Sequence, residues 1–189
     1  MTNKKGGIVV GITGASGAIL GHRILLRIKE LIDDSQKLRV VMSDTARKVW
    51  KHELMLPLPE ETGFTVYDNH HLFADIASGS ASYHTMIVCP CSMGTVGRIA
   101  AGVSDTLLTR AADVMLKERR KLVLVIREAP LSLIHLRNLT TLTESGALVF
   151  PATPFFYHHP RDIDELINPL VNRVLETAGM PGGGYHWGE

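Results

Sequence analysis

Two turns rich in glycine and serine follow short apolar segments and carry residue types suited to binding an anion. The first runs from Gly11 to Ala18 (GITGASGA), with glycines spaced as G-x-x-G-x-x-G. Small residues let the backbone approach a phosphate, and the helix that begins after the turn offers free N–H groups. The spacing matches neither the dinucleotide fingerprint nor a P-loop, so a tight turn without a ligand is the alternative.

The second turn, Cys89 to Thr95 (CPCSMGT), combines two thiols with hydroxyls and a glycine. The thiols have no second pair and no nearby His to complete a zinc site, which favours buried structural cysteines. Ser92, Gly94 and Thr95 suit a phosphate or the edge of a flat heterocycle at the start of another helix. Ser43 also ends an apolar segment, and a serine in place of a ribose-binding acid favours a mononucleotide over NAD.

Charged side chains gather in residues 110–128. Arg110 and Lys117 are seven residues apart and therefore share one face of a predicted helix, whereas Glu118 to Arg120 are interpreted as a solvated charged face. Arg127 and Glu128 directly follow an apolar strand, which favours a position beside a ligand.

A proline-stiffened loop, residues 151–160, contains Tyr157 and two adjacent histidines. Adjacent side chains point apart, and no carboxylate motif accompanies them, so we interpret His158 and His159 as ordinary loop residues. Tyr157 and the helical Arg173 remain candidates for an anion site. We expect no metal site in this chain.

Short β-rich segments alternate with helical patterns along the chain and must position these residues. Strands are predicted at 8–12, 38–42, 85–88, 122–126 and 147–150, and helices at 20–32, 45–54, 96–101, 106–120, 131–145 and 162–178. The alternation predicts an α/β fold with a central parallel sheet, whose ligands bind beyond the carboxyl ends of the strands. We expect one domain over 1–180 and a flexible tail over 181–189.

The composition excludes several classes of protein. The chain has 189 residues, with 20 Lys and Arg against 19 Asp and Glu, so it lacks the basic field of a nucleic-acid-binding protein. No stretch approaches the length of a membrane span, and the first residues do not resemble a signal peptide. With only two cysteines, a reducing compartment is expected, and we predict a cytoplasmic protein.

Taken together and in order, these motifs resemble the UbiX/Pad family of flavin prenyltransferases. The matching segments span nearly the whole chain: GITGASGA (11–18), VMS (41–43), ASGS (77–80), CPCS (89–92), LLTRAADVMLKERR (107–120), REAP (127–130), IHL (134–136) and FYHHP (156–160). The resemblance implies a three-layer Rossmann-like flavoprotein fold and transfer of a dimethylallyl group from dimethylallyl phosphate to N5 and C6 of reduced FMN. It also implies a UbiD-type decarboxylase as recipient of the prenylated FMN, and a homo-oligomer, expected to be a dodecamer, with sites at subunit interfaces.

The resemblance assigns roles to individual residues. Those implied to contact FMN are Gly14, Ala15, Ser16, Ser43, Ser92, Met93, Gly94, Thr95 and Arg127. Those implied to hold the prenyl phosphate are Arg110, Lys117, Tyr157 and Arg173. Ser16, Glu53 and Glu128 are implied to be catalytic, with Glu128 as proton carrier. Some relatives have a Trp just before ASGS, and here Leu72 or Phe73 is expected to replace it.

Two other functions stay open from the sequence. A flavin-dependent decarboxylase of the cysteine-decarboxylase type shares the architecture, but its Asn-containing strand-end motif is replaced here by Pro90-Cys91-Ser92-Met93. A non-catalytic flavin-binding partner subunit is the second alternative, since fold alone does not define function. The expected second anion pocket argues against it, because a protein that only holds FMN needs none.

Overall fold

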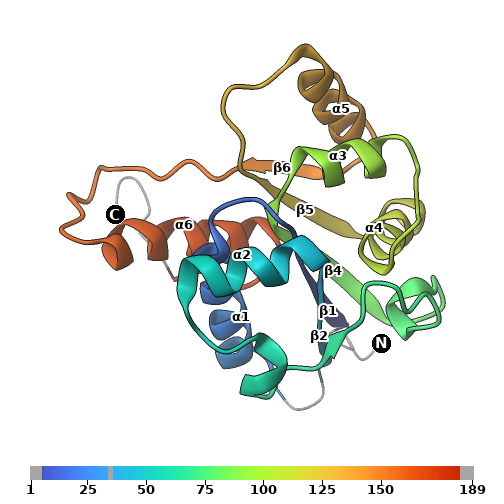
Figure 1. Ribbon diagram of the computed structural model, residues 1–189, viewed down its shortest axis with the longest axis horizontal. Helices are drawn as coiled ribbons and strands as arrows, with labels where there is room; N and C mark the ends of the chain where they lie inside the picture. Colours follow the sequence, from blue (N-terminus) through green and yellow to red (C-terminus); the bar gives the residue numbers. More distant parts are fainter. Residues whose placement is uncertain (1–5, 34–35, 184–189) are drawn as a thin grey trace.

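The computed structural model describes residues 6–33 and 36–183, and a six-stranded parallel sheet forms their centre (Figure 1). The strand order is β3-β2-β1-β4-β5-β6. The strands are β1 (Gly7–Ile12), β2 (Leu38–Met42), β3 (Val66–Tyr67), β4 (Tyr83–Cys91), β5 (Lys121–Ile126) and β6 (Leu148–Pro151). The inner strands are buried on both sides, which explains their nearly continuous apolar sequences.

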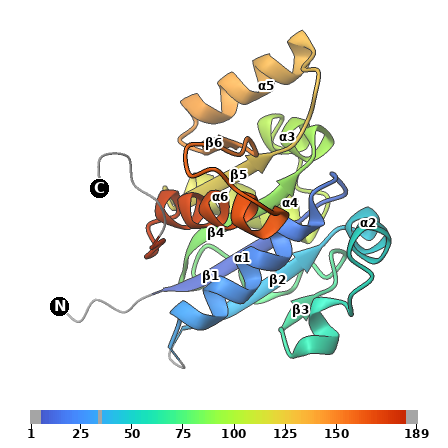
Figure 2. The ribbon, with the colours of Figure 1, turned by 90° about the vertical axis from the view of Figure 1, so that its left-hand side faces the viewer.

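Helices cover both faces of the sheet and create two separate cores (Figures 1 and 2). On one face lie α1 (Ala18–Leu31), α2 (Asp44–Leu54) and α6 (Ile163–Thr177). On the other lie α3 (Met93–Ala100), α4 (Leu107–Lys117) and α5 (Leu133–Glu144). Two short 3-10 turns, η1 (Pro59–Thr62) and η2 (Asp75–Ala77), complete the described elements. The three-layer α/β architecture is therefore confirmed.

The predicted elements are confirmed with shifts of a few residues at their ends, and two details are corrected. The strand β3 was missed, because two residues carry too short a pattern. Cys89 and Cys91, predicted in a turn, instead lie at the end of β4 and are fully buried. Burial raises the pKa of the Cys91 thiol to about 12, in agreement with structural thiols.

The order of strands reverses between β1 and β4, and hydrogen bonds fasten the turns that follow these strands. The buried Thr13 hydroxyl donates to the carbonyl of Pro90 at 2.7 Å and accepts from the Ser92 amide at 2.8 Å. The Ser43 amide donates to the carbonyl of Ile12 at 3.0 Å, which adds the end of β2 to this arrangement. Three strand ends thus meet at the crevice where open α/β sheets bind ligands.

Two parts of the chain extend from this body. Helix α5 packs on α3 and leaves Leu133, Ile134 and Leu136 exposed. The segment between β6 and α6, residues 152–162, runs outward as an extended arm and bears Tyr157, whose exposed fraction is 66% (Figure 1). Within the described residues, every helix is too short or too polar to cross a lipid bilayer.

Candidate active site

The first helix begins with an anion supplied by the chain itself. The Glu53 carboxylate, from the end of α2, accepts hydrogen bonds from the amides of Gly17 at 3.0 Å and Ala18 at 2.9 Å. The sequence predicts a phosphate at these donors, whereas in the structure a carboxylate of the chain itself accepts their hydrogen bonds. Other helix starts nearby offer alternative amides for a phosphate.

Glu53, Ser16 and Arg127 form one cluster. Partial burial acts to raise the pKa of Glu53, but hydrogen bonds from the Ser16 hydroxyl and the Ala18 and Gly17 amides, with the nearby charge of Arg127, hold it below its usual value. Arg127 Nε donates to the carbonyl of Ser16 at 3.2 Å. The structure thus brings together three residues that the sequence places 37 and 74 positions apart.

This cluster gives a test based on pH. The lowered folded pKa means that Glu53 stabilises the fold above its unfolded value, near 4.5, and that this contribution is lost as the pH falls through the folded value. We expect Glu53→Gln to unfold about 2 °C or more below the parent at pH 7, the size of a lost helix cap. The melting temperatures of the two proteins should converge as the pH falls through the folded pKa of Glu53, which lies below 4.5. The exposed control Glu144→Gln should melt with the parent at pH 7 and so has no difference to lose. A difference in melting temperature for Glu53→Gln that stays constant at every pH would contradict the assignment.

A polar pocket of about 330 Å³ lies beside this cluster, where three helices begin. The helix caps Ser43, Ser92 and Thr106 each accept a hydrogen bond from an amide of the first turn of α2, α3 and α4. The first amides of a helix have no partner within it, and its N-terminus carries partial positive charge. Three such ends around one pocket favour a bound phosphate, although the carboxylates of Asp44 and Asp105 also line it.

Four of the residues predicted for the cofactor line the pocket: Gly14, Ser43, Ser92 and Thr95. Met93 and Gly94 form the first turn of α3 between them. A side chain at position 14 would place its Cβ 2.4 Å from Thr45 Cγ2, so only glycine allows the turn to approach α2 this closely. Ala15 is buried at the same turn.

Sequence reasoning missed the rest of the pocket lining. These residues are Asp44, Thr45, Asn69, His70, Arg98, Asp105, Thr106, Leu108 and Thr109. A local signal existed for Thr106 and Thr109, whose spacing forms a reciprocal cap. None existed for Asn69, which reaches the pocket from a loop. Its carbonyl accepts from the Leu107 amide at 2.7 Å, and its Oδ1 accepts from the Leu108 amide at 3.0 Å.

Helix α4 carries Arg110 and Lys117, two of the residues predicted to hold the prenyl phosphate. Arg110 Nη1 donates to Asp113 Oδ2 at 2.7 Å, and Lys117 is paired with Glu118. The ASGS loop packs against this helix, since a Cβ at Gly79 would lie 2.8 Å from Lys117 Nζ. Arg120 was interpreted as part of a solvated face, and this is wrong. Its guanidinium donates to carbonyls of the same loop.

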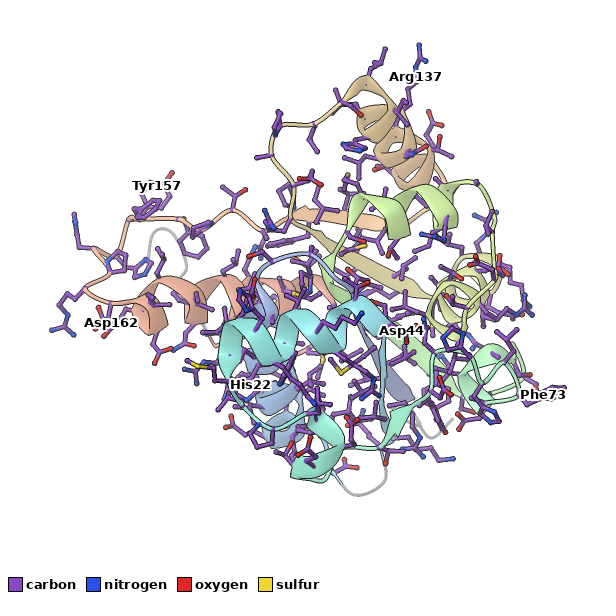
Figure 3. All side chains as sticks on the ribbon, in the orientation of Figure 1. His22, Asp44, Phe73, Arg137, Tyr157 and Asp162 are labelled. Carbon is purple, nitrogen blue, oxygen red and sulfur yellow. The ribbon has the colours of Figure 1, made fainter. Side chains whose placement is uncertain are left out.

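Tyr157 and Arg173 lie elsewhere on the protomer. Helix α6 carries Arg173 and packs in the core opposite to that of α4, so the sheet separates Arg173 from Arg110. Figure 3 shows Tyr157 on the outward arm at the left and Phe73 at the opposite, right-hand edge of the molecule. Phe73 and Leu72 are exposed, as are Glu128 and Tyr157. One copy of the chain therefore does not bring the four residues predicted for the prenyl phosphate together.

The donor set determines which groups this site can hold. No cluster of three potential metal-ligating side chains occurs within residues 6–33 and 36–183. The convergent helix starts fit the phosphate and hydroxyls of a mononucleotide, and the Ser16, Glu53 and Arg127 cluster supplies polar groups for the edge of a planar ring.

His158, predicted to be an ordinary loop residue, contacts the carbonyl of Glu165 through Nε2 at 2.8 Å.

Comparisons with known proteins give a consistent result. The family model named Flavoprotein matches residues 1–175. The flavin prenyltransferase UbiX of Alkalihalophilus pseudofirmus is 43% identical over 197 residues, covering 96% of each chain. The crystal structure of AnUbiX in complex with FMN and dimethylallyl pyrophosphate is 41% identical, has a TM-score of 0.91 and covers 97% of each chain. A dodecameric FMN-dependent Ubix-like decarboxylase from Escherichia coli O157:H7 also has a TM-score of 0.91, with 39% identity over 97% of this chain and 100% of that one.

Proposed function

The chain belongs to the Flavoprotein family and, within it, to the UbiX flavin prenyltransferases, and on that basis we propose that it transfers a dimethylallyl group to reduced FMN. The donor is dimethylallyl phosphate, and the acceptor atoms are N5 and C6 of the flavin. The observation that carries the proposal is the polar pocket at three helix starts, which adjoins the Ser16, Glu53 and Arg127 cluster.

The pocket and the cluster divide the binding of FMN between them. The helix starts at Ser43 and Ser92 hold the phosphate, because their amides and dipoles favour an anion. The ring lies toward Ser16 and Arg127, where Ser16 orients groups around N5. Reduced FMN supplies the nucleophile when bound.

The prenyl phosphate is held by Arg110 and Lys117 from one copy of the chain and by Tyr157 and Arg173 from another. This division is supported by the position of α4 and α6 on opposite faces of the sheet. The cations stabilise the charge that develops on the phosphate as its bond to the allylic carbon breaks. Leu72 and Phe73, exposed in the protomer, form part of the apolar wall for the prenyl group.

Glu128 handles the proton. Its carboxylate is exposed directly after β5 and follows Arg127, which contacts the Ser16 turn. The closure of a ring at C6 requires the loss of a proton from that atom, and a positioned carboxylate accepts it. Ser16 and Glu53 keep the turn and the start of α1 in place around the reacting edge.

The domain extent, the assembly and the recipient of the product follow from this proposed activity. We propose that 1–180 acts as a single FMN-binding domain, with 184–189 of the expected tail outside the described residues. The product passes to a UbiD-type decarboxylase, and the assembly is a homo-oligomer, with a dodecamer expected from the likeness to the dodecameric relative. A cytoplasmic location would keep both the flavin and the two buried thiols reduced.

We expect the purified protein to bind FMN in preference to FAD and NAD, because the pocket presents Ser43 where a dinucleotide enzyme has its ribose-binding acid. Fluorescence titration with the three ligands measures the preference. Tight NAD binding without flavin uptake would contradict it.

The decisive experiment for the activity incubates the protein with reduced FMN and dimethylallyl phosphate and measures the mass of the flavin product. A flavin that has gained a prenyl group supports the proposal. Unchanged flavin together with loss of CO₂ from a peptidyl cysteine would favour the cysteine-decarboxylase alternative. Unchanged flavin with no turnover of either substrate would favour a flavin-binding partner subunit.

A further inference from the structure

Residues 68–82, here called the α4 strap, run along α4 and contact it at both ends. At the first end, the carbonyl and side chain of Asn69 accept hydrogen bonds from Leu107 and Leu108. At the other end, the carbonyl of Ala77 accepts a hydrogen bond from Arg110 Nε at 3.2 Å, and Arg120 contacts the carbonyls of Gly79 and Ala81. The α4 strap therefore joins the flavin pocket to the cationic group on α4.

The middle of the α4 strap is fastened to the sheet by one carboxylate. Tyr67, on β3, donates to Asp75 Oδ1 at 2.8 Å, and Tyr83, on β4, donates to Asp75 Oδ2 at 2.6 Å. Arg39 Nε donates to the Tyr67 hydroxyl at 3.2 Å, so a cation supports the pair from β2. Tyr83 is only 2% exposed. Both oxygens of Asp75 are thus held by groups on rigid strands.

The electrostatics of this network fix its protonation state. Burial acts to raise the pKa of Asp75, but the hydrogen bonds from Tyr83 and Tyr67 and the charge of Arg39 lower it overall. Burial and the same carboxylate raise the pKa of Tyr83. Asp75 is accordingly a carboxylate at neutral pH and Tyr83 a neutral donor, a combination that gives strong charge-assisted hydrogen bonds.

Asp75 lies two residues before the carbonyl that orients Arg110. It begins η2, and the Ala77 and Ser78 amides close this turn onto the carbonyls of Ala74 and Asp75. Arg110 uses Nε for Ala77 and Nη1 for Asp113, and within the described residues Nη2 has no recorded partner. The direction in which Nη2 points therefore depends on where Ala77 is held.

We propose that Asp75 is a positioning residue for prenyl phosphate binding, which it supports by fixing Ala77 and, through Ala77, the guanidinium of Arg110. This inference rests on the proposed function, because it assigns Arg110 to the prenyl phosphate. Asp75 itself contacts neither substrate. It acts on affinity for the phosphate, whereas the flavin end of the α4 strap keeps its separate contacts through Asn69.

The test is a double-mutant cycle on kcat and KM. Asp75→Asn keeps the size but removes one acceptor, so we expect KM for dimethylallyl phosphate to rise about ten-fold, a typical effect of a small displacement of a binding group. The kcat value should fall as KM rises, because the same guanidinium stabilises the charge that develops on the phosphate, whereas FMN affinity should stay within about two-fold. In an Arg110→Ala background the same substitution should raise KM no further, because the residues act through one group.

Two further variants serve as controls. Tyr83→Phe removes one donor and leaves the carboxylate, so it should shift KM in the same direction, and it replaces Asp75→Asn if that variant does not fold. Asp164→Asn makes the same chemical change at a surface ion pair with Arg23 and should leave KM unchanged.

The outcomes distinguish a failure of the positioning role of Asp75 from a failure of the assignment of Arg110 to the prenyl phosphate. Additive effects in the cycle, or an unchanged KM in Asp75→Asn and Tyr83→Phe while Arg110→Ala raises it, would overturn the positioning role and leave the proposed function intact. If Arg110→Ala itself left KM unchanged, the assignment of Arg110 to the prenyl phosphate would be wrong, and the role of Asp75 would fall with it.

Discussion

Replacing Glu128 by Gln is expected to lower single-turnover product formation about a hundred-fold or more while FMN affinity stays near that of the parent. The substitution keeps the size and hydrogen-bonding reach of the side chain and removes only the base. In the protomer, Glu128 is exposed, and its Oε1 accepts a hydrogen bond from the Ala129 amide at 3.2 Å. Because Gln offers a similar acceptor, this local contact survives and the backbone after β5 should not move.

A structural role for Glu128 gives a different pattern. If its carboxylate pairs with Arg127 or with a cation of a neighbouring copy, Glu128→Gln would weaken assembly or thermal stability together with activity. Size-exclusion chromatography, flavin titration and single-turnover kinetics on one preparation distinguish the cases. Parent-like turnover would reject both roles, and a dissociated oligomer with weak flavin binding would reject the catalytic one. Glu144→Gln, an exposed change on α5, controls for loss of charge alone.

The sequence predicted the sheet well because its signal is local. Runs such as Ile8 to Ile12 and Leu122 to Ile126 are apolar throughout, and such runs favour strands buried on both faces of a parallel sheet. The caps Ser43 and Ser92 also stand beside the helices that they start. Local patterns therefore located the elements and two of the helix starts that line the pocket.

What the sequence could not predict depends on contacts between distant residues. Nothing near Gly17 indicates that the carboxylate of Glu53, 36 positions away, accepts hydrogen bonds at the start of α1. Arg120 belongs to a charged run and looked solvated, yet it binds carbonyls of a loop about 40 positions earlier. Asn69 likewise reaches the pocket through a contact with a distant residue, since its side chain accepts a hydrogen bond from the Leu108 amide. Such contacts follow from the arrangement of the elements in space and leave no periodic trace.

If the prenyl phosphate site is divided between copies as proposed, variants that are each defective alone should restore activity when they assemble together. Arg173→Ala and Lys117→Ala each remove a charge-assisted contact with the phosphate, worth about 1.5 to 3 kcal/mol, or about ten- to a hundred-fold in kcat/KM. FMN should stay bound in both, because the flavin pocket uses other elements. Tyr157→Phe should act in the same direction with a smaller effect, since the phenol is neutral.

Mixing the two charge-removal variants tests whether different copies complete one site. If Lys117 and Arg173 of one site come from two chains, co-assembly of Lys117→Ala with Arg173→Ala creates some sites with both parent residues. Random mixing gives roughly a quarter of such sites, so activity should recover to about that fraction of the parent. Subunits are exchanged by co-expression with two affinity tags, and the doubly tagged assemblies are assayed. A site within one chain predicts no recovery, because every chain then carries a defect. The double variant Lys117→Ala/Arg173→Ala mixed with the parent is the matched control: a site shared by two chains leaves about a quarter of its sites intact, and a site within one chain leaves about half.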